Sequence, residues 1–100
     1  MKNVLLSNDG NLFLYSVPDE VADHLSDYCL EFCDHWIWEA PSGSHFLQTF
    51  QGTTIAVYDL FDFIDYLNLL IFPDQPSKLL GRFPSDNVPV EYKDYPYFNF

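Results

Sequence analysis

The alternation of apolar and polar residues predicts a β-hairpin at the N-terminus. Residues 3–6 (NVLL) and 11–17 (NLFLYSV) are short strand-like runs, and SNDG lies between them. An Asp-Gly pair between two apolar runs favours a tight turn, because both central positions of that turn need a positive φ. We therefore expect two antiparallel strands joined at Asp9 and Gly10.

A long helix is predicted from about Pro18 to Trp38, with apolar and acidic residues on opposite faces. Ser16 can cap its start, and Pro18 suits a first helical position. At about 100° per residue, one arc collects the apolar side chains of Val21, Ala22, Leu25, Tyr28, Cys29, Phe32, Cys33 and Trp36. The opposite arc carries Asp19, Glu20, Asp23, Asp27, Glu31 and Asp34. Three apolar residues break the pattern by falling on the acidic side: Leu30, Ile37 and Trp38.

The middle of the chain predicts further strands and a second helix. Residues 45–51 and 54–58 read as one or two strands around Gly52. Asp59 is a natural cap for a helix over about residues 60–72, which ends at a proline. Its inward arc consists of Leu60, Phe63, Ile64, Tyr66, Leu67, Leu70 and Ile71. The outward side carries Phe61, Leu69 and Phe72 among polar residues.

The last quarter of the chain is predicted to be mostly extended. Residues 77–80 are expected to add one helical turn, and three prolines then leave an aromatic tail over 83–100. The order ββ-α-β(β)-α-tail predicts an α+β fold: a small antiparallel sheet of three or four strands, with two helices packed on one face and an extended C-terminal tail. The length favours a single domain over residues 1–100.

Charge narrows the kind of partner. Fifteen acids against four bases give a net charge of −11, and no Lys or Arg occurs between Asn3 and Ser77. Such a surface repels nucleic acid and anionic membranes and favours basic partners. The N-terminus does not resemble a signal peptide, and no apolar run is long enough for a membrane span, so the expected location is cytoplasmic.

Nothing in the sequence predicts a catalytic, cofactor or metal site. Cys29 and Cys33 have helical i, i+4 spacing, but a structural zinc site needs a second close pair of ligands, and both thiols fall on the apolar arc. Packing in the core is therefore the preferred interpretation. His35 lies one turn after Glu31, yet no motif ties a histidine to a nucleophile. We expect no enzyme activity and no cofactor.

The candidate partner-binding residues form an acidic group and an apolar group. Asp19, Asp23, Asp27 and Glu31 recur every four residues, so adjacent carboxylates are expected about 6 Å apart, close to the phosphate spacing of one DNA strand. Asp34 and Trp38 extend this face. Such a row is either a solvated surface or one that fits a cationic groove. The second group, Phe61, Leu69 and Phe72, is a candidate homodimer surface.

Four blocks together resemble a group of uncharacterised bacterial proteins of about this length: DYCLEFCDHW (27–36), DFIDYLN (62–68), IFPDQPS (71–77) and YKDYPYFNF (92–100). The resemblance implies a stand-alone bacterial protein and no particular activity. In composition only, the chain is similar to acidic inhibitors carried by mobile elements, of the anti-restriction or anti-CRISPR type.

The sequence thus predicts a non-enzymatic protein-interaction protein, whose partner is either a second copy in a homodimer or a basic protein. The alternative is an acidic inhibitor or nucleic-acid mimic that binds a basic groove. A third hypothesis is a small enzyme or ligand-binding protein that uses a pocket lined by Trp36, Trp38 and nearby Tyr residues.

Overall fold

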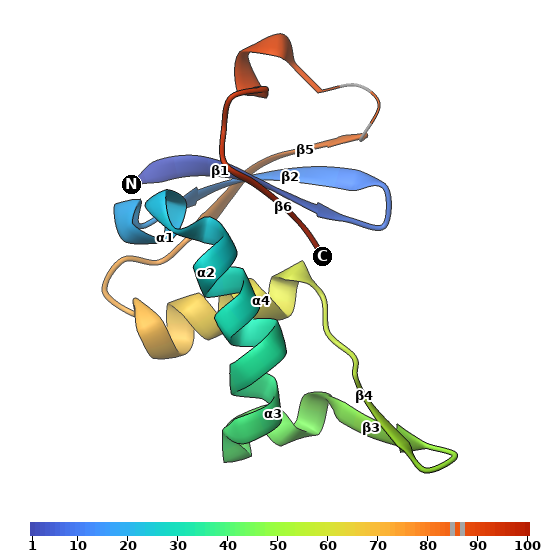
Figure 1. Cartoon of the computed structure of the whole chain (residues 1–100). Helices are drawn as coiled ribbons and strands as arrows, with labels where there is room; N and C mark the ends of the chain where they lie inside the picture. The colour runs from blue at the N-terminus through green and yellow to red at the C-terminus, as the bar shows by residue number, and fades with distance from the viewer. Residues whose placement is uncertain (85, 87) are drawn as a thin grey trace.

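A four-stranded sheet organises one end of the molecule in the computed structural model, which describes residues 1–84, 86 and 88–100 (Figure 1). Its strand order is β5-β2-β1-β6. The strands span Lys2–Asn8 (β1), Asn11–Val17 (β2), Lys78–Pro84 (β5) and Tyr97–Asn99 (β6). β1 pairs antiparallel with β2 and β2 with β5, whereas β1 pairs parallel with β6. The α+β class is confirmed, but the sheet is mixed rather than wholly antiparallel.

The predicted N-terminal hairpin is confirmed. Asp9 and Gly10 connect β1 to β2 with φ values of 51° and 80°. Both angles are positive, as a two-residue turn of this kind requires.

The first helix is not continuous, in contrast to the prediction. α1 (Asp19–Asp23) ends at His24, whose φ of −133° is not helical, and α2 (Leu25–Leu30) begins immediately after it. The break allows α1 to contact β1 while α2 contacts β6. A π-helix, η1 (Glu31–Trp36), and a short α3 (Ile37–Glu39) follow.

The π-helix η1 changes which side chains face the core. A π turn holds one residue more than an α turn, so every later residue is rotated relative to the α-helical pattern. Ile37, predicted on the acidic side, is consequently fully buried, and Trp36 from the predicted apolar arc is only half-buried. Trp38 remains exposed.

The second predicted helix is confirmed as α4 (Leu60–Tyr66) followed by a π-helix, η3 (Leu67–Ile71). The side chain of Asp59 accepts hydrogen bonds from the backbone N–H groups of Phe61 and Asp62. The side chain of Asp62 in turn accepts from the Asp59 N–H, which completes a capping box. Because the π turn rotates the end of this helix, Leu70 and Ile71 are exposed, although their predicted place was in the core.

Residues 45–58 do not join the main sheet. β3 (Leu47–Phe50) and β4 (Thr53–Ala56) form a two-stranded sheet of their own, after a 3-10 helix, η2 (Pro41–Phe46). This β3–β4 hairpin stands away from the main sheet, beyond the lower end of the long helical segment (Figure 1).

The C-terminal quarter is more structured than the predicted extended tail. Residues 78–80 belong to β5, so the predicted helical turn at 77–80 is wrong. A 3-10 helix, η4 (Val90–Tyr92), and β6 follow within the tail. The pairing partners of β5 and β6 are β2 and β1, strands that lie more than sixty residues earlier, and a local pattern does not reveal such contacts.

The main sheet is covered on both faces. The helices lie on one face, as predicted, and Val4, Leu6, Phe13 and Tyr15 pack against them in the larger core (Figure 1). Leu5, Leu12 and Leu14 point to the other face, where Phe83, Val88, Tyr92 and Tyr95 cover them. Period-2 alternation along β1 and β2 therefore fills two separate cores.

Within the part of the chain that the structure describes, no helix is both long and apolar enough to cross a membrane.

Candidate functional site

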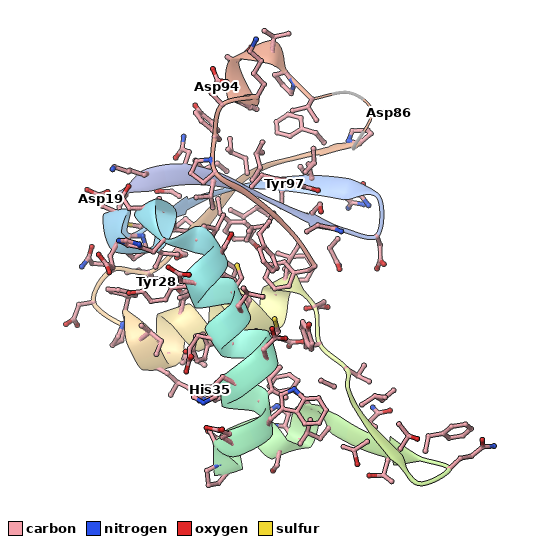
Figure 2. All side chains as sticks on the ribbon, viewed as in Figure 1. Asp19, Tyr28, His35, Asp86, Asp94 and Tyr97 are labelled. Atoms are coloured by element: carbon pink, nitrogen blue, oxygen red, sulfur yellow. The ribbon has the colours of Figure 1, made fainter. Side chains whose placement is uncertain are left out.

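The predicted acidic row is divided by the break at His24. Asp19 and Asp23 lie on α1, whereas Asp27 lies on α2 and Glu31 and Asp34 on η1. All five side chains are exposed. The regular spacing expected from one straight helix is therefore lost between the second and third carboxylates. Figure 2 shows Asp19 beside the N-terminal strands and His35 well along the helical segment.

The first two carboxylates are paired with the positive charges at the start of the chain. The N-terminal amine lies 2.9 Å from Asp19 Oδ1, and Lys2 Nζ lies 2.7 Å from Asp23 Oδ1. The hydrogen bond from the amine lowers the pKa of Asp19, and the hydrogen bond to Asp23 raises the pKa of Lys2. These pairs reduce the negative charge available to a partner at α1.

The other end of the row contains a histidine between two carboxylates. His35 Nδ1 lies 2.7 Å from Glu31 Oε1, and His35 Nε2 lies 2.7 Å from Glu39 Oε2. The hydrogen bond to Glu31 is the main cause that raises the pKa of His35, and the charge of Glu39 adds to it. Asp27 lies 3.8 Å from His24 Nδ1.

The predicted apolar partner residues Phe61, Leu69 and Phe72 differ in how far each side chain is exposed. The Phe61 ring packs edge to face on Phe13, with 5.3 Å between ring centroids. Phe72 is half-buried against Tyr28, and only Leu69 is largely free, with 73% of its surface exposed. Trp38 is exposed, and its indole N–H donates to the Cys33 carbonyl.

The β3–β4 hairpin is an exposed apolar surface that sequence reasoning missed. Gln48 pairs with Ile55 and Phe50 with Thr53, so these four side chains share one face of the hairpin. On the other face, Leu47 and Ala56 pack against the core. Phe50 is 70% exposed and Ile55 48% exposed.

A signal for this surface was present in the sequence. Residues 40–58 contain no Asp, Glu, Lys or Arg, although the whole chain carries fifteen acids. An uncharged stretch in a strongly acidic protein marks a region where a partner can approach without electrostatic repulsion.

A pocket of about 270 Å³ lies between η2 and the outer side of α4 and η3. Trp36, Phe46 and Tyr66 form its aromatic walls, and Asp62 and Asp65 contribute carboxylates. The Trp36 ring centroid lies 5.0 Å from that of Tyr66 and 6.4 Å from that of Phe46. The third hypothesis from the sequence placed Trp36 and Trp38 in one pocket. Trp36 lines this pocket and Trp38 does not, and binding of a ligand there stays a prediction.

Close backbone packing holds η2 in place beside this pocket. Gly43 is buried, and a Cβ atom at this position would lie 2.8 Å from both Ile37 Cα and the Trp36 carbonyl oxygen. Only glycine permits this approach. His45, two residues later, is held by a 2.8 Å contact between its Nδ1 and the Ser42 carbonyl, and its ring lies over Phe46.

Both cysteines lie in the core, as predicted. Cys29 and Cys33 are free thiols that are 0% and 6% exposed. Burial raises the pKa of each thiol, which disfavours the reactive thiolate. Among the described residues, no three His, Cys, Asp or Glu side chains are grouped as a metal site requires.

Comparison with known proteins gives no relative: no protein-family model, no curated protein and no solved structure matches the chain. The resemblance to the bacterial group therefore stays a prediction.

Proposed function

We propose that this chain is a non-enzymatic protein-interaction protein, and that its main interaction element is the β3–β4 hairpin. The observation that supports the proposal is the exposed outer face of this hairpin, whose large apolar side chains are Phe50 and Ile55. A two-stranded hairpin is at best marginally stable on its own in water. A partner that covers the outer face would bury both side chains and order the hairpin.

The partner that we propose is a second copy of this chain, because the hairpin lies in an uncharged stretch of an otherwise acidic molecule. Two molecules of net charge −11 repel each other over most of their surfaces. The stretch 40–58 has no charged Asp, Glu, Lys or Arg side chain, so two copies can meet there without bringing carboxylates together. A symmetric contact would place Phe50 and Ile55 of one copy against the same face of the other.

A surface of this size supports a weak dimer. Stable interfaces bury roughly 1,200–2,000 Å² in total, and one hairpin face with two large apolar side chains is smaller than that. We expect a dissociation constant on the order of 10–100 μM, in the range of transient complexes.

Analytical ultracentrifugation tests for the dimer. The concentration series runs from about 5 to 500 μM, a range set by the expected dissociation constant. The natural chain should shift from monomer to dimer across the series, and Phe50→Ser should remain monomeric because it removes the largest apolar side chain of the contact. Val90→Ser, at an exposed position in η4, is the matched control and should dimerise normally.

A chain that stays monomeric throughout the series would refute self-association. The variant Leu69→Ser tests the other candidate dimer surface, which the sequence predicted on the second helix. Loss of the dimer in Leu69→Ser but not in Phe50→Ser would move the contact to η3.

The environments of the histidines and cysteines support a non-enzymatic role. His35 is held by two carboxylates and His45 contacts a backbone carbonyl, while both thiols are buried, which raises the pKa of each thiol. Nucleophilic catalysis needs a nucleophile activated by an adjacent base. Here the two histidines contact carboxylates or a carbonyl, and the two thiols pack in the core.

An acidic inhibitor of a basic groove is the second candidate, and the exposed carboxylates of α2 and η1 favour it. The triple variant Asp27→Asn, Glu31→Gln, Asp34→Asn tests this function. It should weaken capture of the chain by an immobilised polylysine probe more than a variant with three acids removed elsewhere, at Asp9, Asp74 and Glu91. Equal weakening would show that only net charge matters and would remove this candidate.

A further inference from the structure

We propose that the pocket between η2 and α4 binds a guanidinium group, as presented by an arginine side chain. The pocket combines three aromatic walls, Trp36, Phe46 and Tyr66, with two carboxylates, Asp62 and Asp65. This site is separate from the outer face of the β3–β4 hairpin, so the proposal does not rest on self-association.

The aromatic walls suit a flat cation. Trp36 and Tyr66 lie 5.0 Å apart between ring centroids with an interplanar angle of 57°. Tyr66 is buried, whereas Trp36 is half-buried and stacks on Phe32, so Trp36 offers the more accessible ring. Phe46 forms a further side, 6.4 Å from Trp36. Cations bind over aromatic faces, and tryptophan gives the strongest attraction. A planar guanidinium can stack on one ring and still direct its N–H groups sideways.

Two carboxylates line the same pocket and can accept hydrogen bonds from those N–H groups. Asp62 and Asp65 lie three residues apart on α4, so their side chains share one side of the helix. Asp62 is half-buried, and its Oδ2 accepts the 3.0 Å hydrogen bond from the Asp59 N–H. Asp65 is exposed at the mouth of the pocket.

The net charge of the chain and the apolar lining of the pocket together favour an organic cation as the ligand. The chain has a net charge of −11, and the stretch that supplies this pocket, from Asn3 to Ser77, contains no Lys or Arg that could fill it from within. A calcium ion takes six to eight oxygen ligands, whereas most of this lining is aromatic or aliphatic, including Leu69 and Leu70. An ammonium group is more strongly hydrated than guanidinium, so it loses more hydration free energy when it enters such a site.

The test is a titration with acetyl-arginine-amide, followed by the indole N–H signals in NMR spectra of the chain. Trp38→Phe assigns the two signals. The Trp36 signal should shift with a dissociation constant on the order of 1 mM, as expected for so small a ligand, and the Trp38 signal should not. Acetyl-citrulline-amide, a neutral molecule of the same shape, should cause no shift, and acetyl-lysine-amide should bind at least about 3-fold more weakly.

Asp65→Asn and Asp74→Asn form a matched pair of variants. Both remove one exposed carboxylate, but Asp74 lies at a different place, beside Ser16 and Lys78. Asp65→Asn should weaken arginine binding by roughly 5-fold, and Asp74→Asn should change it by less than about 1.5-fold, because exposed charges act over short distances at physiological salt. Unchanged circular dichroism shows that each variant is folded.

A peptide of sequence Gly-Gly-Arg-Gly-Gly distinguishes a polypeptide ligand from free arginine. Tighter binding of the peptide would identify a polypeptide as the source of the guanidinium, and equal binding would place all recognition in that group; both results support the site. No shift of Trp36, an equal shift with the citrulline compound, or equal weakening in the two Asp variants would each overturn the proposal. The monomeric variant Phe50→Ser should bind arginine as the natural chain does, so failure of one proposal is visible independently of the other.

Discussion

The molecule contains two β-hairpins with the same turn and opposite surroundings. Asp9 and Gly10 have φ values of 51° and 80°, and Gln51 and Gly52 have the same two values. The β1–β2 hairpin lies in the centre of a four-stranded sheet with a core on each face. Among the described residues no further strand joins the β3–β4 hairpin, and Phe50 is exposed.

In both hairpins the turn depends on local residues, whereas the burial of the strands depends on distant segments. A Gly preceded by a residue that tolerates positive φ is sufficient to reverse the chain. Whether the resulting strands are buried depends on which other segments reach them. β5 and β6 reach the first hairpin, and no described segment adds a strand to the second. The first hairpin is therefore part of the core of the fold, and the second keeps one exposed face, which is the surface that we propose for a partner.

The two hairpins are expected to differ most in how far the free energy of unfolding falls when one apolar side chain is removed. Leu6→Ala should lower the free energy of unfolding by about 2–5 kcal/mol, because Leu6 is fully buried and its loss leaves a cavity. Phe50→Ala should change it by less than about 0.5 kcal/mol. Urea titrations of the monomer, followed by circular dichroism, measure both. Equal losses would show that the second hairpin is packed after all.

A smaller and more local difference is expected from the two turn glycines. Gly10→Ala and Gly52→Ala each place a Cβ where nothing lies within 4 Å, so backbone strain at a φ of +80° is their only direct effect. Gly10→Ala should lower the free energy of unfolding by about 1–2 kcal/mol. Gly52→Ala should leave global unfolding unchanged and instead weaken dimer formation.

Hydrogen exchange of the β3 and β4 amides provides the control for this pair. Those amides should exchange faster in Gly52→Ala and at the natural rate in Gly10→Ala. A drop in global stability for Gly52→Ala as large as for Gly10→Ala would contradict the distinction between the hairpins.

The smallest expected effect concerns the ion pairs that tie the first hairpin to α1. The folded pKa of Asp19 lies below its ordinary value of 3.8, so the contact with the N-terminal amine stabilises the fold above about pH 4. That contribution is lost as the pH falls through the lowered pKa.

Urea midpoints measured between about pH 6 and pH 2 test this contact, because stability follows the protons taken up on unfolding. The natural chain should lose stability more steeply at the acid end than Asp19→Asn, in which the contact is already absent. Asp74→Asn, which removes the same charge from a turn, should keep the steep loss. A parallel profile in Asp19→Asn would show that the amine contact does not stabilise the fold.

Several features of the fold were predictable because their causes are local. The Asp9-Gly10 turn, the Asp59 cap and the apolar residues at Val21, Leu25 and Cys29 depend on neighbours within a few positions. Helix starts and tight turns are signalled by single residues with special side chains or dihedral angles. The helices accordingly begin close to where the pattern placed them.

Other features were not predictable because their causes lie far away in the sequence. The break at His24 accompanies contacts of α1 with β1 and of α2 with β6, a strand formed by the last residues of the chain. The π-helix η1 rotates Ile37 into the core and Trp36 toward a pocket formed with η2 and α4. No periodicity calculated for a straight α-helix contains that rotation.

The features of the candidate sites can also be divided into those set by the sequence and those set by contacts between distant segments. The excess of carboxylates and the uncharged stretch 40–58 are properties of the sequence by itself, and they select a basic ligand or a neutral contact. The tertiary structure alone decided that Asp19 and Asp23 are paired with the N-terminal charges, that the β3–β4 hairpin is left uncovered, and that Trp36 meets Asp62 and Asp65 in one pocket. The physical reason is that charge is carried by each residue wherever it lies, whereas burial and pairing depend on distant segments that only folding brings together.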